Sequence, residues 1–230
     1  MDGNFMKNNM ERIIHLNMAM IGGFIGGYAI INHCDLFGSA QTANMIILAQ
    51  ELAGRDRADF FLRLIGLFVY MLGLSSSVFV PKIFKNINLK LYSIIVDALA
   101  LTIVTFIPED TPSFIALYPL FFATAAQWCS FKGMEGYNSA TIFSTNNLRQ
   151  FTTAFTEYLC DKNLAARHKA SLYGCVLISY HIGVAISYFS SVQWGVHSAF
   201  VGLLPIVPAL GLILQEQYDC QQCGCESLAI

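Results

Sequence analysis

The chain has 230 residues, of which 55% are hydrophobic and only 12% are charged. A soluble domain carries about 25% charged residues, so this composition excludes an ordinary water-soluble protein and predicts a multi-pass membrane protein. The net charge is −2, and no basic patch indicates a nucleic-acid partner.

Six apolar stretches are each long enough to cross the bilayer as helices, since about 20 residues span a hydrocarbon core. We expect these spans at residues 13–31, 60–80, 91–107, 113–129, 172–189 and 199–214. The first is longer than a signal-peptide core and is expected to be retained. Pro205 and Pro208 lie inside the sixth span and should kink or locally unwind it, freeing backbone carbonyls.

Two intermediate segments, 40–52 and 141–159, have helical periodicity but contain Gln, Thr, Asn and Glu. If both crossed the membrane, the lysines at 82, 85 and 90 would lie outside, against the positive-inside rule. We therefore predict re-entrant or interfacial helices there. The distribution of Lys and Arg among all the connections predicts that both termini lie in the cytoplasm.

The chain has the pattern of an internal repeat. Thr42 and Asn44 occupy the same place after the first span as Thr145 and Asn147 after the fourth. Each half then reads span, polar segment, span, span, and an odd number of spans inverts the second half. We predict one membrane domain over 1–230, with repeats at 13–107 and 113–214 and a tail at 215–230. Chance similarity of two apolar halves is the alternative.

The polar segments carry the leading site candidates, Asn44 and Asn147, with Thr42 and Thr145 beside them. A carboxamide offers both donors and acceptors, so it can bind a polar solute or hold a re-entrant backbone. The alternative is that these residues cap the ends of short helices.

Two ionisable residues lie inside predicted spans, Asp97 in the third and His181 in the fifth. Such residues are costly in lipid and usually face the protein interior or water. A proton relay and a structural hydrogen bond are the two interpretations.

Four glycines in the first span, Gly22, Gly23, Gly26 and Gly27, form two interleaved Gly-x-x-x-Gly pairs. They predict close packing against another helix, in the same chain or in a homo-oligomer.

No soluble-enzyme signature, nucleotide loop or complete metal-ligand set is present, so we expect no enzymatic activity, cofactor or metal. The three clustered cysteines near the C-terminus, Cys220, Cys223 and Cys225, fall one short of a closed zinc site. Reversible acylation or an unstructured tail are the other interpretations.

At its polar segments the chain resembles the YoaK family of uncharacterised bacterial multi-pass membrane proteins. The elements are 41–44, read as Gln-Thr-Ala-Asn, and 145–149, read as Thr-Asn-Asn-Leu-Arg; Gln127 matches a family glutamine. Ala43 and Asn146 replace two motif glycines, and Gly26 stands where the family often has Asp. The resemblance implies the same architecture and adds little about a substrate.

The sequence therefore predicts an all-α membrane protein with six transmembrane helices, arranged as two inverted repeats that each carry an extra polar helix. Such repeats favour a transporter or channel for a small polar solute. A non-transporting membrane binding or assembly protein is the alternative.

Overall fold

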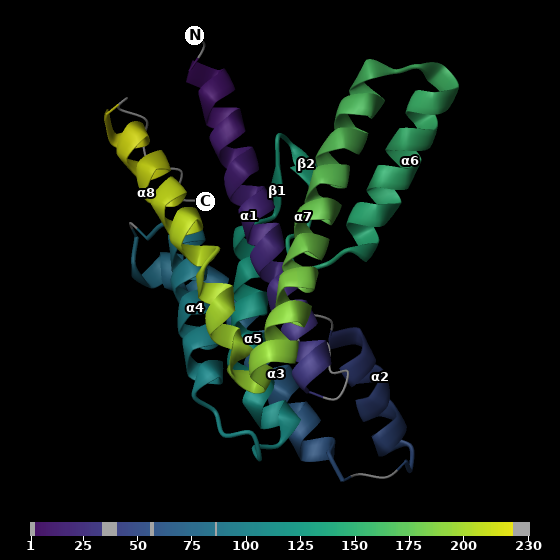
Figure 1. Cartoon of the computed structure of the whole chain (residues 1–230), viewed down its shortest axis with the longest axis vertical. Helices are drawn as coiled ribbons and strands as arrows, with labels where there is room; N and C mark the ends of the chain where they lie inside the picture. Colours follow the sequence, from purple (N-terminus) through teal and green to yellow (C-terminus); the bar gives the residue numbers. More distant parts are fainter. Residues whose placement is uncertain (1–2, 34–40, 56–57, 86, 223–230) are drawn as a thin grey trace.

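The computed structural model describes residues 3–33, 41–55, 58–85 and 87–222. Helices make up almost all of it (Figure 1). Their bounds are α1 (Gly3–Asn32), α2 (Gln41–Leu52), α3 (Phe60–Ile83), α4 (Leu89–Thr105), α5 (Ser113–Ser130), α6 (Thr145–Asp161), α7 (Leu164–Trp194), the 3-10 helix η1 (Gly195–Leu203) and α8 (Ile206–Gln222). The predicted all-α class is confirmed, with one small exception. The two-residue strands β1 (Gly133–Met134) and β2 (Tyr137–Asn138) pair in antiparallel fashion.

The helices follow the sequence prediction closely, because side-chain caps and prolines set their ends. Asn88 accepts hydrogen bonds from the backbone of Lys90 and Leu91 and starts α4. Asn163 caps α7 in the same way, so this helix begins at Leu164 rather than near residue 172. The predicted sixth span is divided, since η1 ends at Leu203 and α8 begins at Ile206. The expected disruption at Pro205 is therefore present.

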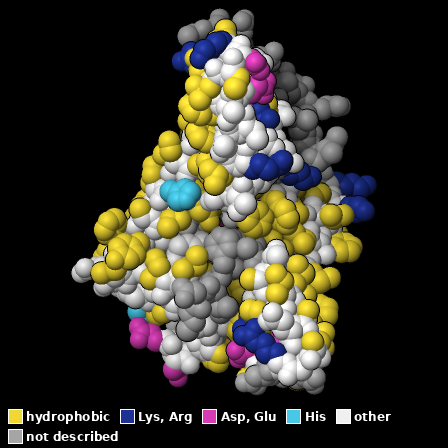
Figure 2. Space-filling view, turned by 90° about the vertical axis from the view of Figure 1, so that its right-hand side faces the viewer, with side chains coloured by type: hydrophobic (Ala, Val, Ile, Leu, Met, Phe, Trp, Pro, Cys, Tyr) yellow, Lys and Arg dark blue, Asp and Glu magenta, His cyan; other side chains and the backbone are white. Residues whose placement is uncertain are grey.

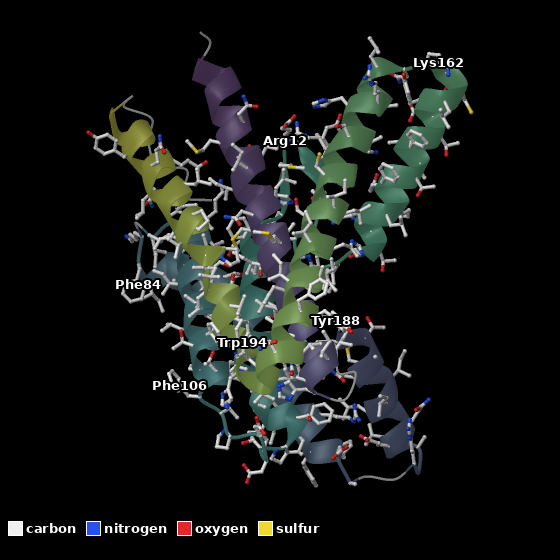
Figure 3. All side chains as sticks on the ribbon, in the orientation of Figure 1. Arg12, Phe84, Phe106, Lys162, Tyr188 and Trp194 are labelled. Atoms are coloured by element: carbon white, nitrogen blue, oxygen red, sulfur yellow. The ribbon has the colours of Figure 1, made fainter. Side chains whose placement is uncertain are left out.

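Three stretches are long and apolar enough to cross a membrane: Asn9–Asn32, Phe60–Ile83 and Leu164–Tyr218, the last including α7, η1 and α8. The helices α4 and α5 have 17 and 18 residues and are shorter. Six spans and two inverted repeats remain predictions. Large apolar side chains cover the outside of the bundle: Phe106, Tyr188 and Trp194 are 80%, 53% and 49% exposed, and Phe106 lies at the edge of the bundle in Figure 3. Lipid is the solvent that suits this surface.

At the centre of the molecule, α1 packs along α7. The two helices run in the same direction, since Arg12 bonds Cys175 near their start and Asn32 bonds Ser191 near their end. Together α3, α4 and α5 form a second group beside them, and η1 and α8 close the bundle over α1 and α4. The helix α6 lies along the first half of α7, whereas α2 lies at the other end of the molecule against α3 (Figure 1).

Candidate functional site

A non-helical segment is buried in the middle of the protein. It runs from the end of α5 to the start of α6, and its residues Ser139, Thr141 and Ile142 are 1%, 0% and 0% exposed. It passes so close to α1 that a Cβ atom on Gly22 would overlap the carbonyl oxygen of Thr141. Irregular backbone at membrane depth is tolerated only where protein or a water-filled cavity covers it. We call residues 139–144, of which 139–142 are buried and Phe143 and Ser144 are partly buried, the buried segment.

Asn147 fastens the buried segment to the first turn of α6. Its Nδ2 donates to the carbonyl oxygens of Ala140 at 2.6 Å and Phe143 at 3.0 Å, and its Oδ1 accepts from the Ala140 amide at 3.2 Å. The carboxamide is 0% exposed, so in this conformation its donors and one acceptor position are occupied by backbone. Asn147 therefore holds the backbone of the buried segment in place.

Gln127 and His15 hold the same segment from α5 and α1. Gln127 Nε2 donates to the carbonyl oxygen of Met18 at 2.9 Å and to Thr141 Oγ1 at 3.1 Å. His15 Nε2 lies 2.7 Å from Ser139 Oγ. Gln127 Oε1 and His15 Nδ1 are buried and have no hydrogen-bond partner among the residues that the structure describes. The sequence analysis missed His15, although the argument that selects Asp97, an ionisable residue inside a span, applies equally to it.

Asn44 belongs to a different cluster, in which α2 turns its polar residues inward. Its Oδ1 accepts from Arg63 at 3.4 Å and its Nδ2 donates to Gln41 at 3.1 Å. Arg63 also pairs with Glu51 at 3.3 Å and lies 4.5 Å from the centroid of the Phe114 ring. Asn44 and Asn147 thus bond to different elements, and the structure does not bring them together. Thr42 and Thr145 are exposed.

We expect Arg63→Met to loosen α2 from α3, because it removes the cation that both Asn44 and Glu51 face. Amide hydrogen exchange across 41–52 should become about tenfold faster, with little change in α7. Arg55→Met is the matched control, since Arg55 makes an exposed bond to Gln50 at the end of the same helix. Equal exchange in both variants would contradict the role of Arg63.

Asp97 is the most unusual polar residue of the interior. It is 0% exposed on the inner face of α4, and neither carboxyl oxygen has a hydrogen-bond partner within the described part of the chain. One turn earlier, Ser93 Oγ is also buried without a partner. By contrast, His181 is exposed and its Nδ1 lies 2.7 Å from the carbonyl of Leu177 in its own helix. The structure does not bring His181 into contact with Asp97.

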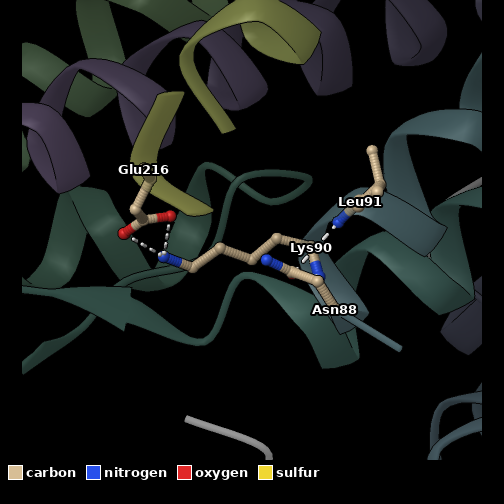
Figure 4. A network of polar contacts seen from close by, with 4 residues as sticks. All are labelled: Asn88, Lys90, Leu91 and Glu216. Atoms are coloured by element: carbon tan, nitrogen blue, oxygen red, sulfur yellow. Dashed lines mark hydrogen bonds and ion pairs between the residues drawn. The ribbon is translucent and has the colours of Figure 1, made fainter. Parts of the chain in front are cut away.

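The helix pair η1–α8 is interrupted beside α4. Asn17 Nδ2 donates to the carbonyl oxygen of Pro205 at the interruption, at 3.1 Å. Beyond it, Lys90 Nζ lies 3.2 Å from both carboxyl oxygens of Glu216 and joins α4 to α8 (Figure 4). The sequence analysis placed the proline break correctly but gave no sign of Asn17, because an isolated Asn carries no distinctive pattern.

The first-span glycines face α7 and the buried segment. A Cβ on Gly23 would overlap the carbonyl oxygen of Tyr180, and one on Gly27 would overlap Ser187 Oγ. Gly26 is buried as well. These contacts lie within one chain. The predictions for Cys223 and Cys225 fall outside the described residues.

A small polar cavity of about 40 Å³ lies at one end of the bundle. Its polar lining comes from Tyr28, Asn32, His33, Glu109, Thr111 and Ser113. His33 is 6% exposed, and its Nε2 has no partner among the described residues. The volume suits a few water molecules and is too small for a sugar or amino acid.

His33 gives the protein a predicted pH dependence. Burial lowers its pKa below the ordinary value of 6.5. The unfolded chain therefore binds a proton that the folded protein does not, and the free energy of unfolding should fall as the pH drops below about 6.5. Thermal unfolding in detergent at about pH 7 and about pH 5 measures this change. His33→Gln should reduce the difference in unfolding temperature between the two pH values. If that difference is unchanged, groups other than His33 cause the pH dependence.

Comparison with known protein families gives a match over most of the chain. The family model described as a protein of unknown function, DUF1275, matches residues 14–213. No curated protein and no solved structure matches the chain.

Proposed function

The chain belongs to the DUF1275 family of proteins of unknown function, and from that premise we propose that it is a multi-pass membrane transporter or channel for a small polar solute. The observation that carries the proposal is the polar interior. Irregular backbone in the buried segment lies inside a bundle whose outside is apolar, and the interrupted η1–α8 pair packs against α1 and α4. Transporters build their sites from such discontinuous elements.

Matching helix contacts support the inverted repeat. A Cβ on Gly183 of α7 would overlap the carbonyl oxygen of Met20 in α1, and a Cβ on Gly73 of α3 would overlap that of Phe122 in α5. If Gly23 and Ala125 are equivalent positions, then Met20 and Phe122 are equivalent too. The second predicted span of each half (α3 or α7) therefore crosses the first span of the other half (α5 or α1) at the equivalent position.

The same contacts reveal a repeated motif that the sequence analysis missed. A tyrosine precedes each crossing glycine by three residues, as Tyr70 before Gly73 and Tyr180 before Gly183. Both tyrosines are buried, at 5% and 6% exposure. The signal was readable as Tyr-x-x-Gly in two predicted spans, but it is too short to stand out without the contacts.

The halves differ around their polar helices. Asn147 fastens the buried segment near the centre of the bundle, whereas Asn44 lies against Arg63. A carrier built from inverted repeats exposes its site to either side when the halves exchange such arrangements. A carrier needs two states, one open to each side of the membrane, and halves in different conformations provide them. The difference therefore favours a carrier over a fixed pore.

Charge placement supports a cytoplasmic location of both termini. The start of α1 and the end of α8 lie at the same end of the molecule (Figure 1). Figure 2 shows most Lys and Arg side chains of one face near that end, with hydrophobic side chains over the middle. This distribution follows the positive-inside rule for a bacterial inner membrane.

A non-transporting membrane binding or assembly protein is the second candidate, and the packed centre favours it. Within the described residues, core side chains such as Ile21, Leu117 and Leu120 are 0% exposed. The polar cavity beside His33 lies at one end rather than at mid-depth. A carrier in an occluded state is packed in the same way, so function must separate the two. An enzyme is not proposed, because the interior ionisable groups Asp97 and His15 do not form a bonded nucleophile, acid and base.

Reconstitution in liposomes tests the proposal. Uptake of neutral, anionic and cationic small solutes is compared for the wild type, Thr141→Ser, Thr141→Val and empty liposomes. We expect the wild type and Thr141→Ser to carry at least one solute. Thr141→Val should reduce that flux about tenfold, because it removes the hydroxyl that Gln127 contacts in the buried segment. No flux above empty liposomes for any solute would favour the assembly protein.

A further inference from the structure

Asp97 poses a charge problem that the proposed transport function does not by itself resolve. An unpaired carboxylate in an apolar interior costs several kcal/mol, by the general cost of burying a charge. Yet both oxygens of Asp97, and the neighbouring Ser93 Oγ, lack a hydrogen-bond partner in the part of the chain that the structure describes. Because the cost is so large, a group of this kind is usually neutralised.

Three contacts between α4 and the η1–α8 pair show which part of that pair lies beside Asp97. Near the start of α4, Lys90 pairs with Glu216; near its end, His197 Nδ1 lies 2.9 Å from the Thr105 carbonyl oxygen. Between them, a Cβ on Gly202 would lie 3.1 Å from Leu101 Cδ1. Asp97 is one turn from Leu101 toward Lys90. One turn of α4, about 6 Å, corresponds to about three residues of a 3-10 helix. Counted from Gly202, this places Asp97 level with Pro205, in the break between η1 and α8.

The break supplies oxygen atoms. Pro205 and Pro208 have no N–H group, so the carbonyls of Gly202 and Leu204 lose the donors that a continuous 3-10 or α-helix would give them. On the other side, Asn17 binds the Pro205 carbonyl and has a buried Oδ1 without a partner. The buried unpartnered atoms of Asp97, Ser93 and Asn17 are thus all oxygens.

Among the described residues, no base neutralises Asp97. Packed against α4 are α5, η1 and α8, with α1 beyond the break. Their titratable side chains with described surroundings have other contacts or are at least partly exposed. Those with other contacts are Tyr118 on the Leu62 carbonyl, Tyr28 on the Val196 carbonyl, His197 on the Thr105 carbonyl, Glu216 on Lys90, His15 on Ser139 and Arg12 on Cys175. Glu11, Cys129 and Tyr218 are partly or fully exposed, as is Tyr92 on α4 itself. A single proton neutralises the carboxyl without a further ligand.

We propose that Asp97, together with Ser93 and the break between η1 and α8, is a proton-binding site that couples transport to the proton gradient. In the packed state, the carboxylic acid keeps the proton on one of its own oxygens. When the break opens to water, the O–H bond breaks, the proton passes to water and the carboxylate remains, hydrated. The coupling role rests on the proposed transport function; the proton site does not.

Infrared spectroscopy tests the site without any solute. The wild type minus Asp97→Asn difference spectrum in liposomes should show the C=O stretch of a protonated carboxyl at neutral pH, and this band should disappear in alkali. Asp110→Asn is the matched control, since Asp110 is exposed; its difference spectrum should show only a carboxylate band. An ionised Asp97 at neutral pH would overturn the proposal. A change in the Asp97 band when potassium replaces sodium would also overturn it, because a metal cation rather than a proton would then neutralise the carboxylate.

Transport measurements separate the two proposals. With flux established, an imposed pH gradient should drive accumulation of solute by the wild type and not by Asp97→Asn. If Asp97 is protonated but the protein carries no solute, the proton-binding site stands and the proposed transport function is wrong. Flux that is equally gradient-driven in Asp97→Asn would leave transport intact and overturn the coupling role.

Discussion

Replacing Asn147 by Ala should destabilise the protein by about 3 kcal/mol or more. The substitution leaves the carbonyls of Ala140 and Phe143 and the amide of Ala140 buried without their partner. Each unsatisfied buried group costs about 1–3 kcal/mol. Thermal unfolding in detergent measures the loss. The midpoint should fall well below that of the wild type, and the buried segment should exchange its amide protons faster.

The neighbouring residue provides the control for Asn147. Asn146 is partly exposed and contacts Arg149 through an exposed hydrogen bond. Asn146→Ala should change stability by no more than about 0.5 kcal/mol. If the two alanine variants unfold alike, Asn147 does not hold the buried segment.

Replacing Gly183 by Ala should force α1 and α7 apart. The added Cβ would overlap the carbonyl oxygen of Met20, and a backbone atom within a packed helix cannot move aside as a flexible side chain can. Overpacking of this kind costs about 3 kcal/mol at the upper end of the usual range, and occasionally more. The same loss is expected for Gly73→Ala, where the overlap is with the Phe122 carbonyl oxygen.

Gly211 is the control for both glycine variants. It lies within α8, and a Cβ there would meet nothing within 4 Å. Gly211→Ala should be neutral, or should stabilise the helix by up to about 1 kcal/mol. Destabilisation equal to that of Gly183→Ala would show that the close crossing is not the cause. A large loss at Gly183 but none at Gly73 would argue against equivalent halves.

The positions of the helices could be read from the sequence because apolar runs, caps and prolines are local signals. The segments 40–52 and 141–159 were expected to be short helices, and α2 and α6 are found there. The break at Pro205 was also foreseen, since proline removes a donor whatever the surroundings. The number of spans and the inverted repeat depend on how the helices sit in lipid, and they stay predictions.

The candidate site was harder to anticipate because it depends on packing between distant elements. Asp97 could be selected from its place in an apolar run, but its lack of a partner is visible only in the structure. The pair Asn44 and Asn147 looked equivalent by spacing, yet one meets Arg63 and the other meets the backbone of the buried segment. A long-range bond such as Asn17 to Pro205 leaves no local pattern.

Water access to the buried segment tests the central claim most directly. The seven native cysteines are replaced by serine, and a single cysteine is placed at Ala140, which is 8% exposed, or at Ala123 in the dry core of α5, which is 0% exposed. A membrane-impermeant maleimide is then added to sealed liposomes. A working carrier should label position 140 progressively, as its states interconvert, and leave position 123 unlabelled. Position 140 remaining as unreactive as position 123 would contradict a solute pathway through this protein.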